Sequence, residues 1–418
     1  MTILIKRGEH ETKLESKMRG LLWVLCMTFA FFFTSCSSDN DIEPETQTDT
    51  YINLLVSTPT TKATSNTQLE DDQVAANPTE EEKIYSIRVW AYPTNSSDDS
   101  APIGYTEKTS LDATGSTNVS MKILRKYAQS NQNLDLYILI NAESIGKGTV
   151  VAGKNNNVVT RSELANLKLD DNTEFGITES GTAKTTSVPS TGLPINRVVT
   201  NIATSSYVKE SEAEASANPI KINLARAVSK LHFYFSRKQN AGTDLVKITR
   251  IELDANFLPT ESPLFPEAAT YSVNEKSNVD IHGTYASNIS YVNKKVTLGG
   301  VENKDIKELA NPSEYIKSSR ETAQVYVNRL ANAGIAEHNR CYFRESNKPV
   351  SGTIYYTLAD GLTEHSVKFT IPGANTPAYR NHDLLVYGHF EEGDNQELQL
   401  SYYVASWKEK KATTITFN

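Results

Sequence analysis

Few residues of this sequence have the types and spacing that catalysis or ion binding requires. Residues 148–154 (GTVVAGK) resemble a phosphate-binding loop, but Asn155 stands where a Ser or Thr would hold magnesium, and no helix pattern follows. Residues 170–176 (DDNTEFG) come nearest to a calcium loop, yet no register aligns both the glycine and a final glutamate. The sequence therefore predicts solvated loops, without a bound nucleotide or calcium ion, at both places.

The histidines and carboxylates form no catalytic pattern either. None of the seven His belongs to a His-x-x-His or His-Glu-x-x-His pair, the spacing that a zinc-binding helix needs. His382 and His389 lie an odd number of residues apart in one predicted strand, so they point to opposite faces. Glu391 and Glu392 stand beside Gly393, which favours a solvated hairpin turn over an acid and base pair. The sequence thus predicts a protein that is not an enzyme and has no catalytic, metal or cofactor site.

Cys36 has the clearest chemistry in the sequence. It follows a nearly unbroken apolar run at residues 21–33 and the small residues Thr34 and Ser35, with Arg19 in front of the run. This order of a basic, a short apolar and a small-residue part is typical of a signal peptide, and the run is short for a membrane span. Its end resembles the lipobox of bacterial lipoproteins, in which the cysteine is acylated and becomes the first residue.

We therefore expect residues 1–35 to be a lipoprotein signal peptide that is removed, whether translation starts at Met1 or at Met18. Lipid on Cys36 would then attach the protein to a membrane. Residues 36–50 are polar and contain no apolar run, so they predict a flexible tether between the lipid and the folded protein.

The charge balance excludes partners that carry many phosphates. The 418 residues include 42 basic and 50 acidic ones, with a formal net charge of −8 and a pI near 5.5, which gives no attraction to nucleic acid or an anionic membrane. Once Cys36 is acylated, Cys341 is the one cysteine left in the mature chain, so no intramolecular disulfide can form. Its strand-like surroundings predict a buried small residue instead of a reactive thiol.

From residue 51 on, the apolar residues fall in short runs of strand length. The clearest runs are residues 51–56, 84–92, 134–140, 231–235, 248–253, 354–358, 367–371, 384–390 and 398–404. Several alternate between apolar and polar residues, which is typical of antiparallel sheets with one buried face in a sandwich. Thr160 and Glu163 form a capping box that predicts a short helix. We expect an all-β fold with one or two short helices.

The strand-like runs fall into two groups. Residues 210–219 lack apolar periodicity, and a new series of runs opens at Ile220. We therefore expect an N-terminal β-sandwich domain at residues 51–215 and a C-terminal β-sandwich domain at residues 216–418.

Three stretches carry a family resemblance. They are residues 84–92 (IYSIRVWAY) with 136–142 (LYILINA), residues 224–231 (LARAVSKL), and residues 380–387 with 398–407. In this order they cover both predicted domains and resemble the fimbrillin family, the subunits of lipoprotein-derived type V pili. The resemblance implies two tandem transthyretin-like β-sandwiches, export to the outer membrane as a lipoprotein, and a structural role in a surface fimbria that contributes to adhesion.

The resemblance also implies assembly by donor-strand exchange, in which a protease removes the first strand and a strand of the next subunit fills the groove. Stalk subunits of the family are matured by an Arg-specific protease, yet no Arg occurs from Cys36 to Ile87. Lys62, followed by Ala63, occupies the place where an Arg is expected and is the candidate cleavage position. Either a protease of another specificity cuts there, or the first strand stays and the protein is a fimbrial anchor, tip or accessory subunit.

The C-terminal residues 411–418 (KATTITFN) are a candidate donor strand. Ile415 and Phe417 alternate with Thr414 and Thr416, so an extended strand presents both apolar side chains on one face. The same pattern fits a last strand that completes the chain's own sandwich. The expected partners are other fimbrial subunits, the outer membrane through the lipid, and a host or bacterial surface ligand.

A surface lipoprotein that binds glycans is the alternative function. It would share the signal peptide, the acidic charge and the sandwiches, but it should expose a cluster of Trp. Trp90 and Trp407 lie in or beside apolar runs, where burial in a core is expected. The sequence therefore favours the fimbrial function.

Overall fold

The computed structural model describes most of the chain after residue 48. The described residues are 49–58, 80–129, 132–170, 188–239, 246–272, 281–298, 306–318, 321, 323–358, 363–371, 377–390, 398–406 and 415–416. They belong to one compact unit, Thr48–Asn418. Within these ranges, no helix has the length and apolar character needed to cross a membrane.

Two sheets built mainly from the first half of the chain pack face to face. Their strands are β1 Asp49–Ser57, β3 Ile87–Pro93, β4 Gly104–Lys108, β6 Ser116–Leu124, β7 Asn133–Ile140, β9 Ile195–Ala203, β10 Ile220–Asn223, β11 Ala225–Arg226 and β15 Ala269–Thr270. One sheet has the order β10-β1-β6, and the other has the order β11-β9-β7-β3-β4, with β15 beside β9. Alternate residues of both sheets, such as Leu54, Val89 and Ile138, are fully buried in the first hydrophobic core between them.

A second pair of sheets follows from β12 on. Its strands are β12 Val228–Lys238, β13 Lys247–Leu253, β16 Val296–Leu298, β17 Lys307–Leu309, β18 Glu337–Arg344, β19 Val350–Thr357, β20 Glu364–Ile371, β21 His382–Phe390, β22 Leu398–Ser406 and β23 Ile415–Thr416. The orders are β17-β12-β21-β22-β23, with β18 also paired to β12, and β16-β13-β19-β20. Phe233, Ile354 and Leu384 are among the residues that form the second core between these sheets. The predicted all-β sandwich fold class is therefore confirmed.

The sheets are mixed, whereas the sequence pattern predicted antiparallel ones. β12 runs parallel to β21, from the pair Lys230↔Asp383 to the pair Arg237↔Phe390, and β1 runs parallel to β10. The alternation of apolar and polar residues along a strand shows which face of the strand is buried, and this alternation is the same whether the neighbouring strand is parallel or antiparallel. The pattern could therefore predict a sandwich but not the direction of its strands.

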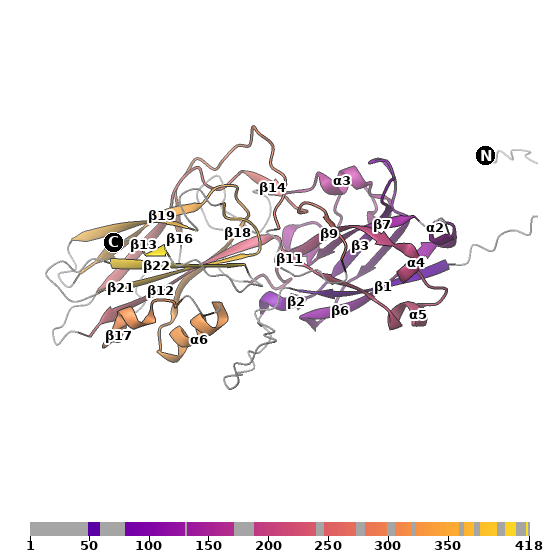
Figure 1. The fold of residues 1–418 in the computed structure, drawn as a ribbon. Coiled ribbons are helices and arrows are strands. Elements are labelled where there is room, and N and C mark those ends of the chain that lie inside the picture. Colours follow the sequence, from indigo (N-terminus) through magenta and orange to yellow (C-terminus); the bar gives the residue numbers. More distant parts are fainter. Residues whose placement is uncertain are drawn as a thin grey trace, which may run out of the picture. The chain divides into compact units, whose positions relative to one another are not determined.

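The outer face of the sheet that contains β3 is also covered. Trp90 and Tyr92 of β3 pack on this face against Leu164 of the helix α3 (Arg161–Ala165), which lies over β3 and β7 in Figure 1. Trp90 is completely buried, as predicted, and its indole N–H donates to the carbonyl oxygen of Asn156 at 2.7 Å. β3 is thus buried on both faces, which explains its continuous apolar run.

The second sandwich has an outer layer of its own. Helix α6 (Ala323–Asn332) places Tyr326 and Leu330 against Tyr234 of β12 and Leu385 of β21. In Figure 1 this helix is drawn below β12 and β21. The capping box at Thr160 predicted α3 and is confirmed, because the Glu163 N–H donates to Thr160 Oγ1. Helix α6 was not predicted, although Ser318 and Glu321 have the spacing of a capping box just before it and the Ser318 N–H donates to Glu321 Oε2 at 2.9 Å.

Short elements complete the described chain. The other α-helices are α2 Arg125–Gln129, α4 Thr204–Tyr207 and α5 Glu212–Ala217, so that the described residues hold five instead of one or two. The 3-10 turns are η1 Glu80–Glu82, η2 Ala142–Ile145, η3 Asn156–Val158 and η4 Pro312–Tyr315. Two small sheets pair β2 Lys83–Ile84 with β5 Ala113–Thr114, and β8 Lys168–Asp170 with β14 Glu261–Pro263.

The predicted domain boundary after residue 215 lies inside α5. The next strand, β10, pairs with β1 in the first sandwich, and β12 opens the second one. The division at this residue stays a prediction.

Candidate functional site

β1 lies in the middle of its sheet. It pairs antiparallel with β6 along its whole length, Asp49–Ser57, and parallel with β10 from Leu54 to Ser57; β1 and β6 can be followed side by side in Figure 1. Without β1, the facing edges of β6 and β10 would carry backbone N–H and C=O groups that lack partners. The position of β1 is therefore a site where another strand could bind.

The core face of β1 is apolar. Ile52, Leu54 and Val56 are completely buried in the first core, and burying one such side chain stabilises a protein by roughly 1.5–3 kcal/mol. They occupy three places along the groove between β6 and β10. A strand that replaces β1 needs apolar side chains at the same two-residue spacing.

The opposite face of β1 carries a buried polar residue. Asn53 is 4% exposed, and its Nδ2 donates to Ser120 Oγ of β6 at 2.9 Å and to Ser216 Oγ of α5 at 3.2 Å. A shift of β1 by one residue would turn this amide toward the apolar core, away from both hydroxyls. Asn53 therefore fixes the register of β1 in the groove.

A cluster of charged side chains joins η1 to the second sandwich. Glu81 of η1 is buried, with its Oε1 3.1 Å from Lys230 Nζ of β12, and it accepts a 2.7 Å hydrogen bond from the Tyr342 hydroxyl of β18. Lys230 Nζ also lies 3.6 Å from Asp383 Oδ2 of β21. Burial acts to raise the pKa of Glu81, but Lys230 and Arg226 outweigh burial and hold that pKa below its ordinary value.

His232 of β12 extends this cluster. Its Nε2 lies 2.8 Å from Asp383 Oδ1, and its Nδ1 lies 3.0 Å from Glu337 Oε1. Burial acts to lower the pKa of His232, but the two carboxylates, Asp383 above all, raise it above its ordinary value. Burial acts to raise the pKa of Glu337, yet hydrogen bonds from His232 and Arg340 lower it to about 2. The raised pKa favours the imidazolium form of His232, which lies between two carboxylates.

The cluster determines what a cut near Lys62 would separate. η1 is the first described element after residues 59–79, which include Lys62. Glu81 ties η1 to β12 and β18 of the second sandwich. A cut at Lys62 would leave this attachment in place and break the covalent link to the preceding part of the chain, which contains β1.

Most of the site residues predicted from the sequence lie outside the described part of the chain, namely Cys36, Lys62, Ala63, Thr414 and Phe417. Ile415 and Thr416 form β23, which pairs antiparallel with β22 at Tyr402 and Ser401. In this structure the last strand lies at the edge of the chain's own second sandwich. Its use as a donor strand stays a prediction.

Two residues first considered for chemistry, Lys154 and Cys341, have structural roles, whereas residues 171–176 of the segment compared with a calcium loop lie outside the described residues. Lys154, in the segment that resembles a phosphate-binding loop, is paired with Glu163 of α3, with Nζ–O distances of 2.6 and 2.7 Å. Cys341 is buried in β18, as predicted, and burial raises the pKa of its thiol to about 12. Across the described ranges, no group of three or more His, Cys, Asp and Glu side chains is arranged to hold a metal ion.

Sequence reasoning missed the charged cluster, although a signal was present. Lys230 and His232 stand at alternate positions of an otherwise apolar run, opposite Leu231 and Phe233, which face the second core. Two charged residues on one face of a buried strand require partners nearby. The partners could not be named, because Glu81 and Asp383 come from distant parts of the chain.

Comparison with known proteins gives structural neighbours only. No family model matches this chain, and no curated protein matches its sequence. Similar solved structures include a candidate cell adhesion protein from Parabacteroides distasonis, with 13% identity, a TM-score of 0.47, and coverage of 86% of this chain and 97% of that one. Another is the tip fimbrial protein Mfa3 from Porphyromonas gingivalis with C-terminal truncation, with 12% identity, a TM-score of 0.45, and coverage of 86% and 100%. A candidate cell adhesion protein from Bacteroides eggerthii has 13% identity, a TM-score of 0.41, and coverage of 85% and 96%.

Proposed function

We propose that this protein is a structural subunit of a cell-surface fimbria, exported as a lipoprotein and assembled by donor-strand exchange. The observation that carries the proposal is the position of β1, the first described strand, which is paired on both sides and has three fully buried aliphatic side chains. Loss of such a strand opens a groove that a strand of another subunit can fill. The resemblance of residues 84–92 and 224–231 to fimbrillin motifs supports the same function.

The order of the sites along the chain suits this function. Cys36, the predicted lipid attachment, precedes β1, and Lys62, the predicted cleavage position, follows it. One cut between Lys62 and Ala63 would therefore end the covalent link of both the lipid and β1 to the rest of the subunit.

The replacing strand would take the direction of β1, antiparallel to β6 and parallel to β10. In the candidate donor segment, Ile415 and Phe417 are two residues apart, the spacing of Ile52 and Leu54 in β1. A subunit that donates its last strand and accepts another in its groove uses two different surfaces. Such a heterologous contact does not close on itself, so it grows into a filament.

A fimbrial anchor, tip or accessory subunit is the second candidate function. The absence of Arg between Cys36 and Ile87 favours it, because the Arg-specific maturation typical of the family's stalk subunits has no site there. Such a subunit keeps β1 and the lipid and stays on the outer membrane. A surface lipoprotein that binds glycans remains the non-fimbrial alternative.

Expression of the full chain in a Gram-negative host that exports and lipidates it tests the proposal. We expect filaments by negative-stain microscopy and Ala63 as the N-terminus of the filament protein. Lys62→Ala should abolish filaments, whereas Lys83→Ala, at the next lysine of the chain, should leave them. Acylated Cys36 as the N-terminus of a surface protein without filaments would instead establish the anchor or accessory function.

A further inference from the structure

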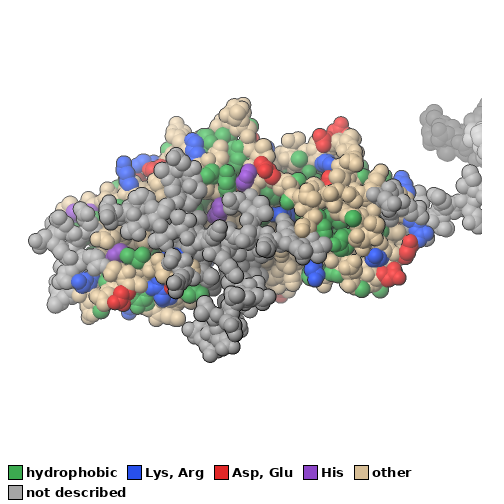
Figure 2. All heavy atoms as spheres, in the orientation of Figure 1, with side chains coloured by type: hydrophobic (Ala, Val, Ile, Leu, Met, Phe, Trp, Pro, Cys, Tyr) green, Lys and Arg blue, Asp and Glu red, His purple; other side chains and the backbone are tan. Residues whose placement is uncertain are grey.

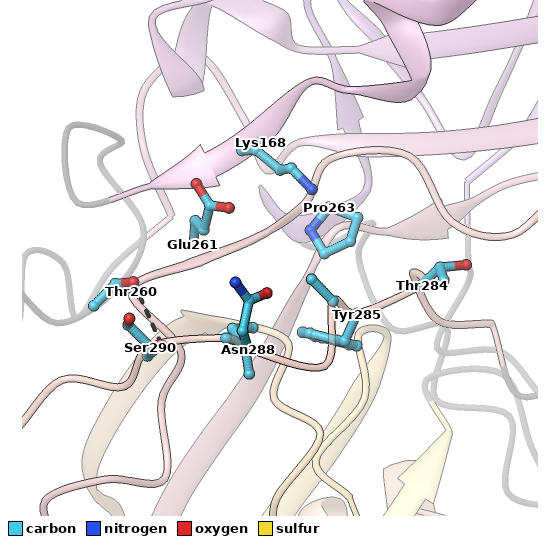
Figure 3. A pocket seen from close by; sticks show the side chains of 10 residues that line it. Lys168, Thr260, Glu261, Pro263, Thr284, Tyr285, Asn288 and Ser290 are labelled. Carbon is cyan, nitrogen blue, oxygen red and sulfur yellow. Dashed lines mark hydrogen bonds between the residues drawn. The ribbon is translucent and has the colours of Figure 1, made fainter.

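A polar hollow of about 200 Å³ lies where β8 and β14 meet the segment of residues 284–290. Figure 3 shows Lys168 reaching toward it from β8, Asn288 from the facing loop, and Glu261 and Pro263 from β14. The ring of Tyr285 forms part of its wall. The hollow is far from β1 in sequence and uses none of the residues proposed for strand exchange.

The walls of the hollow are fixed by backbone contacts. β8 pairs antiparallel with β14, and the Thr260 N–H donates to the Ser290 carbonyl at 2.9 Å, which joins β14 to the loop. The Gly283 N–H donates to Glu345 Oε1 at 2.8 Å, and a Cβ at Gly283 would come within 2.6 Å of Pro263. The loop therefore packs against β14 at a distance that only glycine allows, and the hollow is formed before any ligand arrives.

Three polar side chains that line the hollow have no partner in the described part of the chain. Lys168, Glu261 and Asn288 make neither a hydrogen bond nor an ion pair there. They are a donor, an acceptor and a group that both donates and accepts. The hollow thus presents both kinds of hydrogen-bonding group to a ligand without first breaking an interaction of the protein.

The chemistry of these groups selects the ligand class. The charges of Lys168 and Glu261 cancel, so the hollow has no net attraction for an anion, and its single carboxylate is too few for a metal ion. A sugar hydroxyl donates to a carboxylate and accepts from an ammonium or amide, and the Tyr285 ring offers a surface for the apolar face of a pyranose. The volume is below the roughly 300–1,000 Å³ of pockets that bury drug-sized ligands, which suits one sugar unit.

We propose that this hollow binds one unit of a neutral saccharide, which would give the protein a glycan-binding site independent of its assembly. Binding in a small, water-accessible hollow is weak, and we expect a Kd on the order of 1 mM. Saturation-transfer NMR on the full exported protein in detergent, with galactose, mannose, fucose and N-acetylglucosamine as probes, should show signals from at least one of these sugars.

Variants show whether the signal comes from the hollow. Asn288→Ala and Glu261→Gln should each weaken binding by about tenfold or more. The first removes a hydrogen-bonding partner of a sugar hydroxyl, and the second replaces a charged acceptor by a weaker, neutral one. Asn95→Ala and Glu212→Gln, at exposed positions elsewhere, are matched controls that should bind as the wild type does. All four changes are on the surface, so unchanged melting temperatures should show that the variants are folded.

Two results would overturn the site. One is the absence of a signal from all four sugars, and the other is binding that Asn288→Ala and Glu261→Gln leave unchanged. Preference for sialic acid over the neutral sugars would overturn the ligand class. Binding of an unrelated peptide that competes with the sugars would show that the hollow is a peptide site instead.

Discussion

The cluster around Lys230 and His232 shows how this protein holds buried charges. Asp383 lies within 3.6 Å of both cations, and Glu81 lies 3.1 Å from Lys230. Removing ions from water is costly, and mutual attraction offsets that cost only while every ion keeps a partner. Replacement of one charged residue of the cluster should therefore weaken the attachment of η1 to the second sandwich, because it leaves the remaining buried charges without a partner.

The protonation of His232 should make stability depend on pH. Folding raises the pKa of His232, so its contribution to stability is complete below about pH 6.5 and is lost as the pH rises through the folded-state pKa. We expect the melting temperature of the wild type to fall as the pH rises above about 6.5. The variant His232→Gln should lack the part of this fall that comes from His232. Thermal melts at a series of pH values should show the same fall in the control variant His365→Gln as in the wild type. An equal dependence of the melting temperature on pH in all three proteins would contradict the role given to His232.

Along β1, the two faces should respond differently to truncation. Leu54 is completely buried in the core face, whereas Leu55 is partly exposed on the other face. Leu54→Ala should lower the free energy of unfolding of the uncut protein by about 2–5 kcal/mol, and Leu55→Ala by clearly less. Urea denaturation measures both changes. Equal losses would mean that β1 does not occupy the core position described here.

The elements that could be predicted from the sequence are those whose residues all obey one local pattern. The run at residues 84–92 predicted the strand β3, and Thr160 with Glu163 predicted α3. The pairing of β10 with β1 was missed, because strand partners depend on contacts with distant parts of the chain. The groove around β1 therefore became visible only in the structure.

The last strand distinguishes two modes of assembly. β23 pairs with β22 in this structure, so deletion of residues 413–418 removes a strand from the edge of the second sandwich. If the strand is donated in fibres, the shortened protein should remain folded and soluble but form no filaments. If it is only intrinsic, the monomer should melt at a lower temperature while filaments persist. A shortened protein that equals the parent in both assays would exclude either use.

At the scale of the whole molecule, the sites predicted from the sequence lie near the ends of the chain, and those found in the structure lie mostly in its middle. The sites at Cys36 and Lys62 are predictions from short local patterns, whereas the charged cluster and the hollow each combine residues from distant segments. The face in Figure 2 shows basic and acidic side chains interspersed over the described surface, as the modest net charge suggests. Net charge and motifs could therefore limit the classes of partner that the protein binds, but they could not locate the binding sites.

Release from the membrane should require strand replacement and not only proteolysis. β1 is paired with β6 over its whole length and buries Ile52, Leu54 and Val56, and these contacts do not depend on the peptide bond after Lys62. Each of the three side chains stabilises the bound strand by roughly 1.5–3 kcal/mol, so the cut fragment should dissociate slowly. If Cys36 carries a lipid as proposed, the cut subunit should thus stay attached to the membrane through β1.

Lipidated protein in vesicles, with a recognition site for a specific protease inserted after Lys62, tests this order of events. After complete cutting, the protein should still sediment with the vesicles, and addition of a peptide with the sequence of residues 411–418 should release it. A peptide with both Ile415 and Phe417 replaced by Ser should not, because it offers the groove no apolar side chains at the required spacing. Release by the protease alone would show that β1 is not held by the groove, and retention with the unchanged peptide would show that this segment is not the donor.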